Sequence, residues 1–403
     1  MGEALDGSMD KILEYIPQDL IVTLVAIAAA LGAMLGVISY LILLERKLSA
    51  WMQDRRGPNR VGPMGVFQPL ADGAKFLLKE DVITANADKV LFVAAPGIGL
   101  LTSMLAFAVV PYGPVGMEGV PWFLRFVIAP NVDIGVVFIF AVTSLSVYGV
   151  ILGGWASNNK YSALGALRAS AQVISYEIPL GMSILGVALL GSTLNIQEIL
   201  TQQATGGFWN WYFWTQPLAC LIFFTSAMAE ANRLPFDLSE CEQELVGGFH
   251  TEYSSMKFAL FFLGEYAHVI TTSFLTVILF FGGWHFPWIA TPESTYAGAW
   301  AVMLLVLLTK VFMVIVLIML LRWTIPRFRF DQLMNLSWKA LIPLSLANML
   351  AVMTVLQFGW DRWLLAPISI GLFALAGVIS VGVKRAEIRH RPSAVDLSHH
   401  LAT

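Results

Sequence analysis

Long runs of apolar residues constrain this chain more than any other feature of its sequence. A helix that crosses a bilayer needs about 20 mostly apolar residues, and nine runs of about that length follow one another between polar segments. Because lipid offers the backbone no hydrogen-bond partners, only helices are plausible for runs this long and this apolar. The nine predicted spans are 20–44, 90–111, 131–154, 172–192, 214–231, 255–283, 298–321, 337–358 and 363–383.

The composition supports an all-α integral membrane protein. Only 13% of the 403 residues are charged, whereas a soluble domain has about a quarter. The two cysteines, Cys220 and Cys241, are too few for an iron–sulfur cluster or a cysteine-based zinc site, and they give no disulfide framework. If the protein takes part in redox chemistry, the redox metals are therefore not bound by cysteines of this chain.

The distribution of Lys and Arg predicts the orientation, because cytoplasmic loops carry an excess of these residues. When the loops are assigned alternately to the two sides, one side receives 20 of the 24 basic residues. The other side receives Lys11, Arg125 and Arg362, and Lys310 lies inside a span. This asymmetry places the amino terminus outside and the carboxy terminus in the cytoplasm, and it requires an odd number of spans.

The predicted spans divide the chain into three parts. Residues 1–19, with five acidic residues and one lysine, predict an amphipathic lead-in on the outer face rather than a cleavable signal peptide. Residues 20–358 form a core of eight spans, and residues 359–403 add a ninth span and a cytoplasmic tail. The cytoplasmic loops of the core are 45–89, 155–171, 232–254 and 322–336.

The first cytoplasmic loop contains a predicted amphipathic helix. Apolar and polar residues in VFQPLADGAKFLLKED recur on opposite faces at helical spacing. We expect this helix to lie in the membrane interface, under a partner subunit, or both. Beside the first span it could frame an opening from the lipid, large enough for an apolar ligand. The apolar face is Val66, Phe67, Leu70, Ala74, Leu77 and Leu78, and the polar face is Gln68, Asp72, Lys75 and Lys79.

Basic residues next to the membrane also have a simpler interpretation. Arg56 and Arg60 in the first loop are typical of positive-inside anchors. The basic and aromatic segment RWTIPRFRFDQLMNLSWK, residues 322–339, is typical of snorkelling arginines and interfacial tryptophans. The sequence therefore predicts no nucleic-acid binding.

Ionisable residues inside apolar runs are costly and by default indicate a functional site. Glu177 lies in the fourth span, Glu230 ends the fifth, and Glu265 lies about ten residues into the sixth, roughly 15 Å deep at 1.5 Å per residue. With Glu45 at the end of the first span, these acids predict a polar path toward the membrane centre, as in proton relays. The alternative is a set of unrelated structural pairs, for instance Glu265 with Lys310 of the seventh span.

The segment FDLSECEQELVGGFHTEY, residues 236–253, is an acidic loop between the fifth and sixth spans. Ser239 and Glu242 have the spacing of a capping box, so a short helix is predicted to start there, with Glu240 and Glu244 one turn apart. In a solvated loop the repulsion between Glu240 and Glu244 costs a few tenths of a kcal/mol and indicates no function. In a closed cavity these groups would share protons and titrate as a coupled set. The local sequence leaves both interpretations open.

Four long segments carry a resemblance to a known family. They are ERKLSAWMQDRRGPNRVGPMGVFQPLADGAKFLLKED, GWASNNKYSALGALRASAQVISYEIPLG, AEANRLPFDLSECEQELVGGFHTEYSSMKFALFFLGEYA and PRFRFDQLMNLSWKALIPLSL. In this order they resemble the H-type membrane subunit of respiratory complex I, NADH:quinone oxidoreductase (subunit 1 in mitochondria). The match runs from about residue 20 to 358. The ninth span and tail go beyond the eight-span mitochondrial form and resemble bacterial versions.

The resemblance implies a heel subunit that joins the membrane arm to the peripheral arm and lines a quinone chamber open to the lipid. It implies quinone (ubiquinone or menaquinone) as substrate, with no flavin, iron–sulfur cluster, metal or NADH site in this chain. The implied residues at the chamber and its mouth are Glu45, Arg46 and Asp72, and we add Arg56, Arg60 and Phe67 of the same loop as candidates for the chamber or its entrance. The implied proton path is Glu240, Glu242, Glu244 and Glu252 below the chamber, then Glu177, Glu230 and Glu265 leading inward. Lys310, a lysine inside a span, is our additional candidate for this path.

The resemblance also implies partners and a location. The partners are the peripheral-arm subunits of the quinone site on the cytoplasmic face and small membrane-arm subunits beside this chain in the bilayer. The location is the plasma (inner) membrane of a bacterium rather than the mitochondrial inner membrane. One rival is the homologous subunit of a membrane-bound hydrogenase or of a ferredoxin- or formate-linked complex, which needs no quinone entrance. A second is an autonomous secondary transporter, a class that usually shows internal repeats.

Overall fold

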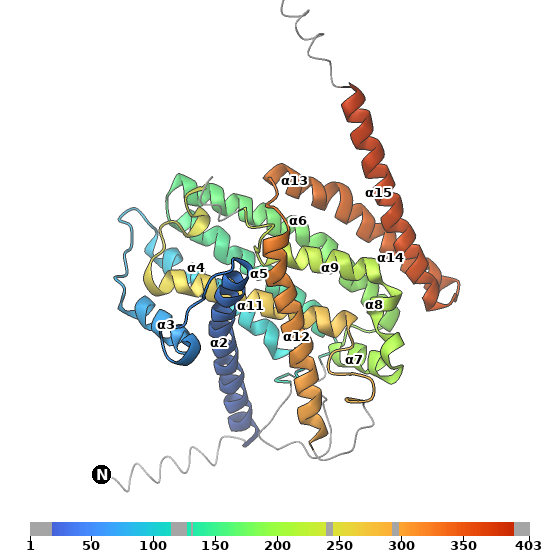
Figure 1. Ribbon diagram of the computed structural model, residues 1–403, viewed down its shortest axis with the longest axis horizontal. Coiled ribbons are helices and arrows are strands. Elements are labelled where there is room, and N and C mark those ends of the chain that lie inside the picture. Colours follow the sequence, from blue (N-terminus) through green and yellow to red (C-terminus); the bar gives the residue numbers. More distant parts are fainter. Residues whose placement is uncertain (1–17, 114–126, 130–131, 239–244, 292–297, 391–403) are drawn as a thin grey trace, which may run out of the picture.

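The computed structural model describes residues 18–113, 127–129, 132–238, 245–291 and 298–390, and this part of the chain is helical, without strands. Within these described residues, eight segments are long and apolar enough to cross a membrane. They lie in α2, α4, α5, α6, α11, α12, the joined α13 and α14, and α15 (Figure 1). The predicted all-α membrane class is confirmed. The long helices are α2 (Gln18–Met52), α4 (Lys89–Leu105), α5 (Gly135–Ala156), α6 (Lys160–Gly191), α11 (Ser255–Phe280), α12 (Ala299–Thr324), α14 (Ile342–Gln357) and α15 (Leu365–His390).

The fifth predicted span is shorter than the others. It consists of α8 (Tyr212–Thr215) and the 14-residue α9 (Pro217–Glu230), which are separated at Gln216. At 1.5 Å per residue α9 is only about 21 Å long, less than the roughly 30 Å of a hydrocarbon core. Gln216 is fully buried, and its side-chain amide donates to the Gly186 carbonyl of α6 at 3.0 Å. The break between α8 and α9 is therefore held by a specific contact.

The amphipathic helix predicted in the first loop is present as α3 (Gln68–Leu78). None of its residues is buried, and Leu70, Leu77 and Leu78 are 69%, 71% and 87% exposed. Within the described part of the chain, the apolar face of α3 is uncovered. The remaining short helices are α7 (Ile196–Thr205) and α13 (Phe330–Asn335).

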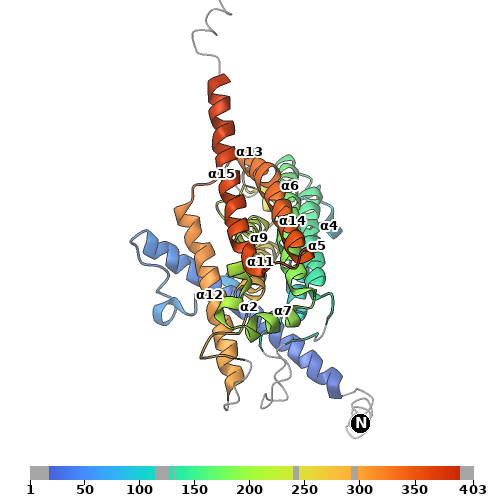
Figure 2. The same cartoon turned by 90° about the vertical axis from the view of Figure 1, so that its right-hand side faces the viewer.

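Helix α11 lies at the centre of the molecule. It contacts α2, α4, α9 and α12, and it has the largest buried share of the eight candidate spans. In Figure 1, α2 and α12 stand upright while α6, α9 and α11 run across the view. Helix α15 lies at the right-hand edge of Figure 1 and stands upright in Figure 2, and it packs on α14. Polar residues on α11 are thus surrounded by protein.

A proline in α6 creates a contact with the segment before α14. Pro179 has no N–H, so the carbonyl of Ser175 one turn earlier cannot make its usual helical bond. The Ser337 hydroxyl donates to this carbonyl at 2.6 Å from a π-helical turn, Leu336–Leu341. Trp338 Nε1 also donates to the Ser175 hydroxyl at 3.2 Å. These bonds fix the part of α6 that carries Glu177.

Candidate functional site

Glu45, near the end of α2, is a buried carboxylate between two arginines. Its side chain accepts a hydrogen bond from the Tyr266 hydroxyl at 2.6 Å. Arg233 Nη1 lies 3.4 Å from Oε2, and Arg322 Nη1 contacts Oε1. Glu45 is only 7% exposed. A carboxylate this buried requires such partners, because unpaired charges are strongly disfavoured away from water.

Arg233 follows α9 and connects Glu45 to α11. Its guanidinium lies over the ring of Tyr266, 4.1 Å from the centroid, as in a cation–π contact. Burial opposes its charge, but nearby groups, with Tyr266 and Glu45 foremost, raise its pKa above the usual arginine value. Glu265 acts on Arg233 in the same direction. The guanidinium is therefore a fixed positive charge between carboxylates of α2 and α11.

These residues line a polar cavity of about 480 Å³. Its walls come from α2, the segment after α9, α11 and the end of α12. Asp237 and Arg327, also in the wall, approach each other to 3.5 Å. Alternating acids and arginines around one volume can bind a polar head group and exchange protons with it. The charged lining residues are Glu45, Arg233, Asp237, Glu265, Arg322 and Arg327.

A second cavity, of about 370 Å³ and mostly apolar, lies between α2, α3 and α11. Its polar feature is the pair of Arg46 and Asp72, joined at 2.7 Å, which ties α2 to α3. Phe258 and Phe262 of α11 line both this cavity and the polar one, and their ring centroids are 5.0 Å apart. The two volumes therefore share an aromatic wall. Further lining residues of the apolar cavity are Leu35, Ile42, Phe76, Met256, Ala259 and Leu263.

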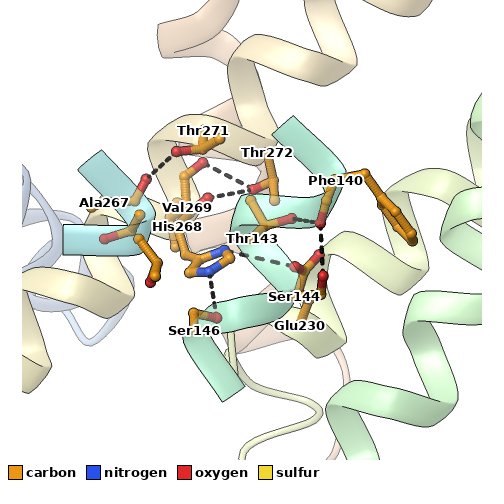
Figure 3. A network of polar contacts seen from close by, with 12 residues as sticks. Phe140, Thr143, Ser144, Ser146, Glu230, Ala267, His268, Val269, Thr271 and Thr272 are labelled. Carbon is orange, nitrogen blue, oxygen red and sulfur yellow. Dashed lines mark hydrogen bonds and ion pairs between the residues drawn. The ribbon is translucent and has the colours of Figure 1, made fainter. Parts of the chain in front are cut away.

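Deeper in the molecule, Glu230 and His268 form a buried polar pair (Figure 3). His268 Nδ1 of α11 lies 4.0 Å from Glu230 Oε1 of α9. Nε2 of the same ring lies 3.1 Å from the Ser146 hydroxyl of α5. Glu177 of α6, which is only partly buried, interacts electrostatically with Glu230. Four helices thus contribute to one polar cluster.

A small cavity of about 50 Å³ joins this cluster to Glu265. Glu230, Glu265, His268, Ser146 and Asn232 are among its lining residues. Glu265 lines the polar cavity as well. The structure therefore brings three of the acids predicted from the sequence, Glu45, Glu265 and Glu230, around two adjoining cavities, with Glu177 behind them.

Other predicted site residues lie elsewhere or outside the described residues. Glu252 accepts a hydrogen bond from Asn159 at the start of α6 and is not among the described residues that line the polar cavity. Arg56 and Arg60 are exposed, and Phe67 is half exposed. Glu240, Glu242 and Glu244 lie outside the described residues, as do Cys241, the predicted capping box and residues 1–17.

Lys310 does not pair with Glu265, the alternative that the sequence suggested. Its ammonium donates to the backbone carbonyls of Phe281, Gly283 and His285 at 2.7 to 2.9 Å, beyond the end of α11. It also lies over the ring of Trp211, 4.3 Å from the centroid. Burial, helped by the charge of Lys310, lowers the pKa of His285 to about 4. Lys310 therefore holds the loop between α11 and α12.

Several site residues were not singled out from the sequence. Arg233 and Arg322 were only counted in the charge asymmetry, and Tyr266 and His268 were not considered. A usable signal was present in GEYAH: Glu265 and His268 are three residues apart, so they share a helix face. Among the described residues, no group of three or more His, Cys, Asp or Glu could hold a metal ion.

Comparison with known proteins adds the following matches. Residues 24–353 match the family described as NADH dehydrogenase. The H 1 subunit of the NADH-quinone oxidoreductase of Cytophaga hutchinsonii is 45% identical over 329 residues, covering 81% of this chain and 94% of that protein. The H 2 subunit of the same enzyme from Koribacter versatilis is 44% identical over 345 residues (82% and 96%). NADH-quinone oxidoreductase subunit 8 of Rhodothermus marinus is 45% identical over 331 residues (80% and 93%).

Proposed function

This chain belongs to the NADH dehydrogenase family and is a membrane subunit of an NADH-quinone oxidoreductase, and from this premise we propose that it forms the quinone chamber and starts the proton path of that complex. The rival hydrogenase and transporter interpretations are not retained, because the similar proteins are named as H-type or number 8 subunits of this enzyme.

The proposal rests on the apolar cavity and the polar cavity, which share the wall formed by Phe258 and Phe262. The apolar cavity between α2, α3 and α11 suits the entry of an apolar ligand from lipid, and its volume lies in the usual range of ligand pockets. The polar cavity beyond Phe258 and Phe262 suits the head group of ubiquinone or menaquinone. Quinone passing between them must displace these two rings, because both rings line both volumes.

The proton path begins at the polar cavity. Reduction of the quinone creates negative charge that draws protons, and Glu45 and Glu265 are the carboxylates of the wall on α2 and α11. From Glu265 the path continues across the small cavity to Glu230 and then toward Glu177, which interacts electrostatically with Glu230. The acids Glu240, Glu242 and Glu244 are proposed to sense or carry the same protons from the loop below the chamber.

The proposal includes an orientation and partners. The amino terminus lies outside and the carboxy terminus in the cytoplasm of a bacterium, in agreement with the 20 basic residues assigned to one side. Peripheral-arm subunits dock on the cytoplasmic face, and small membrane-arm subunits lie laterally. The quinone is the substrate, and the electron carriers belong to other subunits.

A photoreactive quinone tests the route in the intact, membrane-embedded complex. We expect it to label peptides of α2, α3 and α11 around Phe258 and Phe262, and excess unmodified quinone should prevent the labelling. Peptides of α7, which contacts α11 at Ile278, far from Phe258 and Phe262, serve as the internal control. Competable labelling that is confined to α7 or to helices outside both cavities would contradict the route.

A further inference from the structure

His268 occupies a gap in the proposed chain of carboxylates. Glu265 faces the polar cavity, whereas Glu230 lies on a different helix, at the far side of the small cavity. His268 follows Glu265 by one turn of α11, so both side chains lie on the same face. His268 approaches Glu230 to 4.0 Å and lines the small cavity together with both acids. It therefore stands between the two ends of the gap.

The two nitrogens of the imidazole have different surroundings. Nε2 lies 3.1 Å from the Ser146 hydroxyl. Nδ1 is buried without a hydrogen-bond partner in the part of the chain that the structure describes, and it is aimed at Glu230 (Figure 3). A buried polar atom without a partner is rare in folded proteins. Such an atom beside a carboxylate and a cavity is suited to accept a proton.

The small cavity has room and partners for water. A water needs roughly 10–15 Å³ of accessible volume and two to four polar partners. The cavity offers about 50 Å³, and Glu230, Glu265 and His268 are in its wall. A water there lies between Glu265 and the Glu230–His268 pair, whose residues all line the cavity.

We propose that His268 is a proton-carrying residue that links Glu265 to Glu230, an inference that rests on the proposed proton path. With hydrogen on Nε2, the ring donates to Ser146 and leaves Nδ1 free to accept. A proton leaves the Glu265 carboxyl, crosses the bridging water and binds Nδ1, which gives an imidazolium. The same proton then leaves Nδ1 for the Glu230 carboxylate, and the neutral ring is restored.

The groups around His268 favour this role. Helix α9 contributes Glu230, α5 contributes Ser146, and Glu177 of α6 interacts electrostatically with Glu230. Helix α4 contributes Gly99 to the wall of the small cavity, so it adds no charge there. Among the described residues, the titratable groups in that wall are thus two acids and the imidazole. Opposite charges on either side stabilise the imidazolium while it exists.

The test compares His268→Gln with the native residue in the purified, intact complex. Glutamine can still donate to Ser146, but it cannot take up a proton. We expect quinone-linked NADH oxidation to fall about tenfold or more, as for the loss of a proton-transfer group. NADH oxidation with a water-soluble artificial acceptor, which bypasses the membrane arm, should stay normal. The subunit composition of the purified complex reports assembly.

Two control variants separate proton transfer from packing. Ser146→Ala removes the hydrogen bond to Nε2 but keeps Nδ1, so it should reduce turnover less than threefold. His285 lies beyond the other end of α11, where its ring contacts Trp211. The substitution His285→Gln should leave turnover unchanged. His268→Asn serves as a second variant if His268→Gln assembles poorly. Equal losses in Ser146→Ala and His268→Gln would overturn the proposal, as would loss of assembly in both His268 variants.

Normal turnover and a normal proton-to-electron ratio in His268→Gln would also overturn the inference. Glu265→Gln and Glu230→Gln show whether the proposed function fails with it. If these two slow the quinone-linked reaction while His268→Gln does not, only the role of His268 is wrong. If all three variants are normal, the proton path through these acids is wrong as well.

Discussion

At the scale of a single residue, Glu45 is a buried charge at the head of the proposed proton path. Its carboxylate is buried, yet it faces a cavity and holds Arg233, Arg322 and Tyr266 in place. Removing one partner from a buried ion pair costs about 3–5 kcal/mol, because the remaining charge stays buried and unpaired. The electric field at the start of the proposed proton path therefore depends on Glu45.

For Glu45→Gln we expect quinone reductase activity to drop about tenfold or more. A loss of about 1.4 kcal/mol, which is less than the cost of breaking the buried ion pair, already corresponds to a factor of ten. The activity of the purified complex with a short-chain quinone is the measurement, normalised to its activity with an artificial acceptor. Glu198→Gln is the matched control, because Glu198 is exposed on α7 and contacts Thr193. An equal effect of both substitutions would contradict the role given to Glu45.

Single residues were only partly predictable. Glu45, Glu230 and Glu265 stand out because a carboxylate in an apolar run requires an explanation. His268 did not stand out, because one histidine in a helix carries little signal until its neighbours on other helices are known. The resemblance assigns Glu252 to the path, and its charge inside a span makes Lys310 a candidate. Their contacts to Asn159 and to three carbonyls depend on the tertiary fold and could not be predicted.

At the scale of the elements, periodicity and length predicted most of the fold. Helix α3 was recognised because its apolar and polar residues alternate with a helical period. The short α9 was not resolved from α8, because the break depends on Gln216 reaching Gly186 of another helix. The π-helical turn before α14 was not predictable either, since its partner is a carbonyl that Pro179 leaves free 162 residues earlier in the chain.

Ser337→Ala tests that contact between helices. Without the hydroxyl, the buried Ser175 carbonyl loses its donor, which costs about 1–3 kcal/mol. We expect faster thermal inactivation of the quinone-linked reaction, followed at several temperatures. Thr354→Ala is the control on α14, because the Thr354 hydroxyl is exposed and bonds only within its own helix. If the two variants lose activity at the same rate, the contact with Ser175 does not stabilise α6.

At the scale of the whole molecule, the charge asymmetry predicts the orientation. Trp288→Cys, placed at an exposed position between α11 and α12, should react with a membrane-impermeant thiol reagent added from outside. Ser393→Cys in the tail should react only from the cytoplasmic side. Both substitutions are made with Cys220 and Cys241 changed to serine, and intact cells are compared with inverted vesicles. The opposite labelling pattern would reverse the proposed orientation.

The start of α11 has a mechanical consequence. The Ser255 hydroxyl lies within 2.9 and 3.0 Å of the carbonyls of Phe76 and Lys79, which end α3. Lys257 is joined to Asp81 at 2.8 Å in the same region. The end of α3 is therefore bonded to the first turn of α11. A displacement of α3 would act directly on the helix that carries Glu265 and His268, whereas Lys310 holds the segment beyond the far end of that helix.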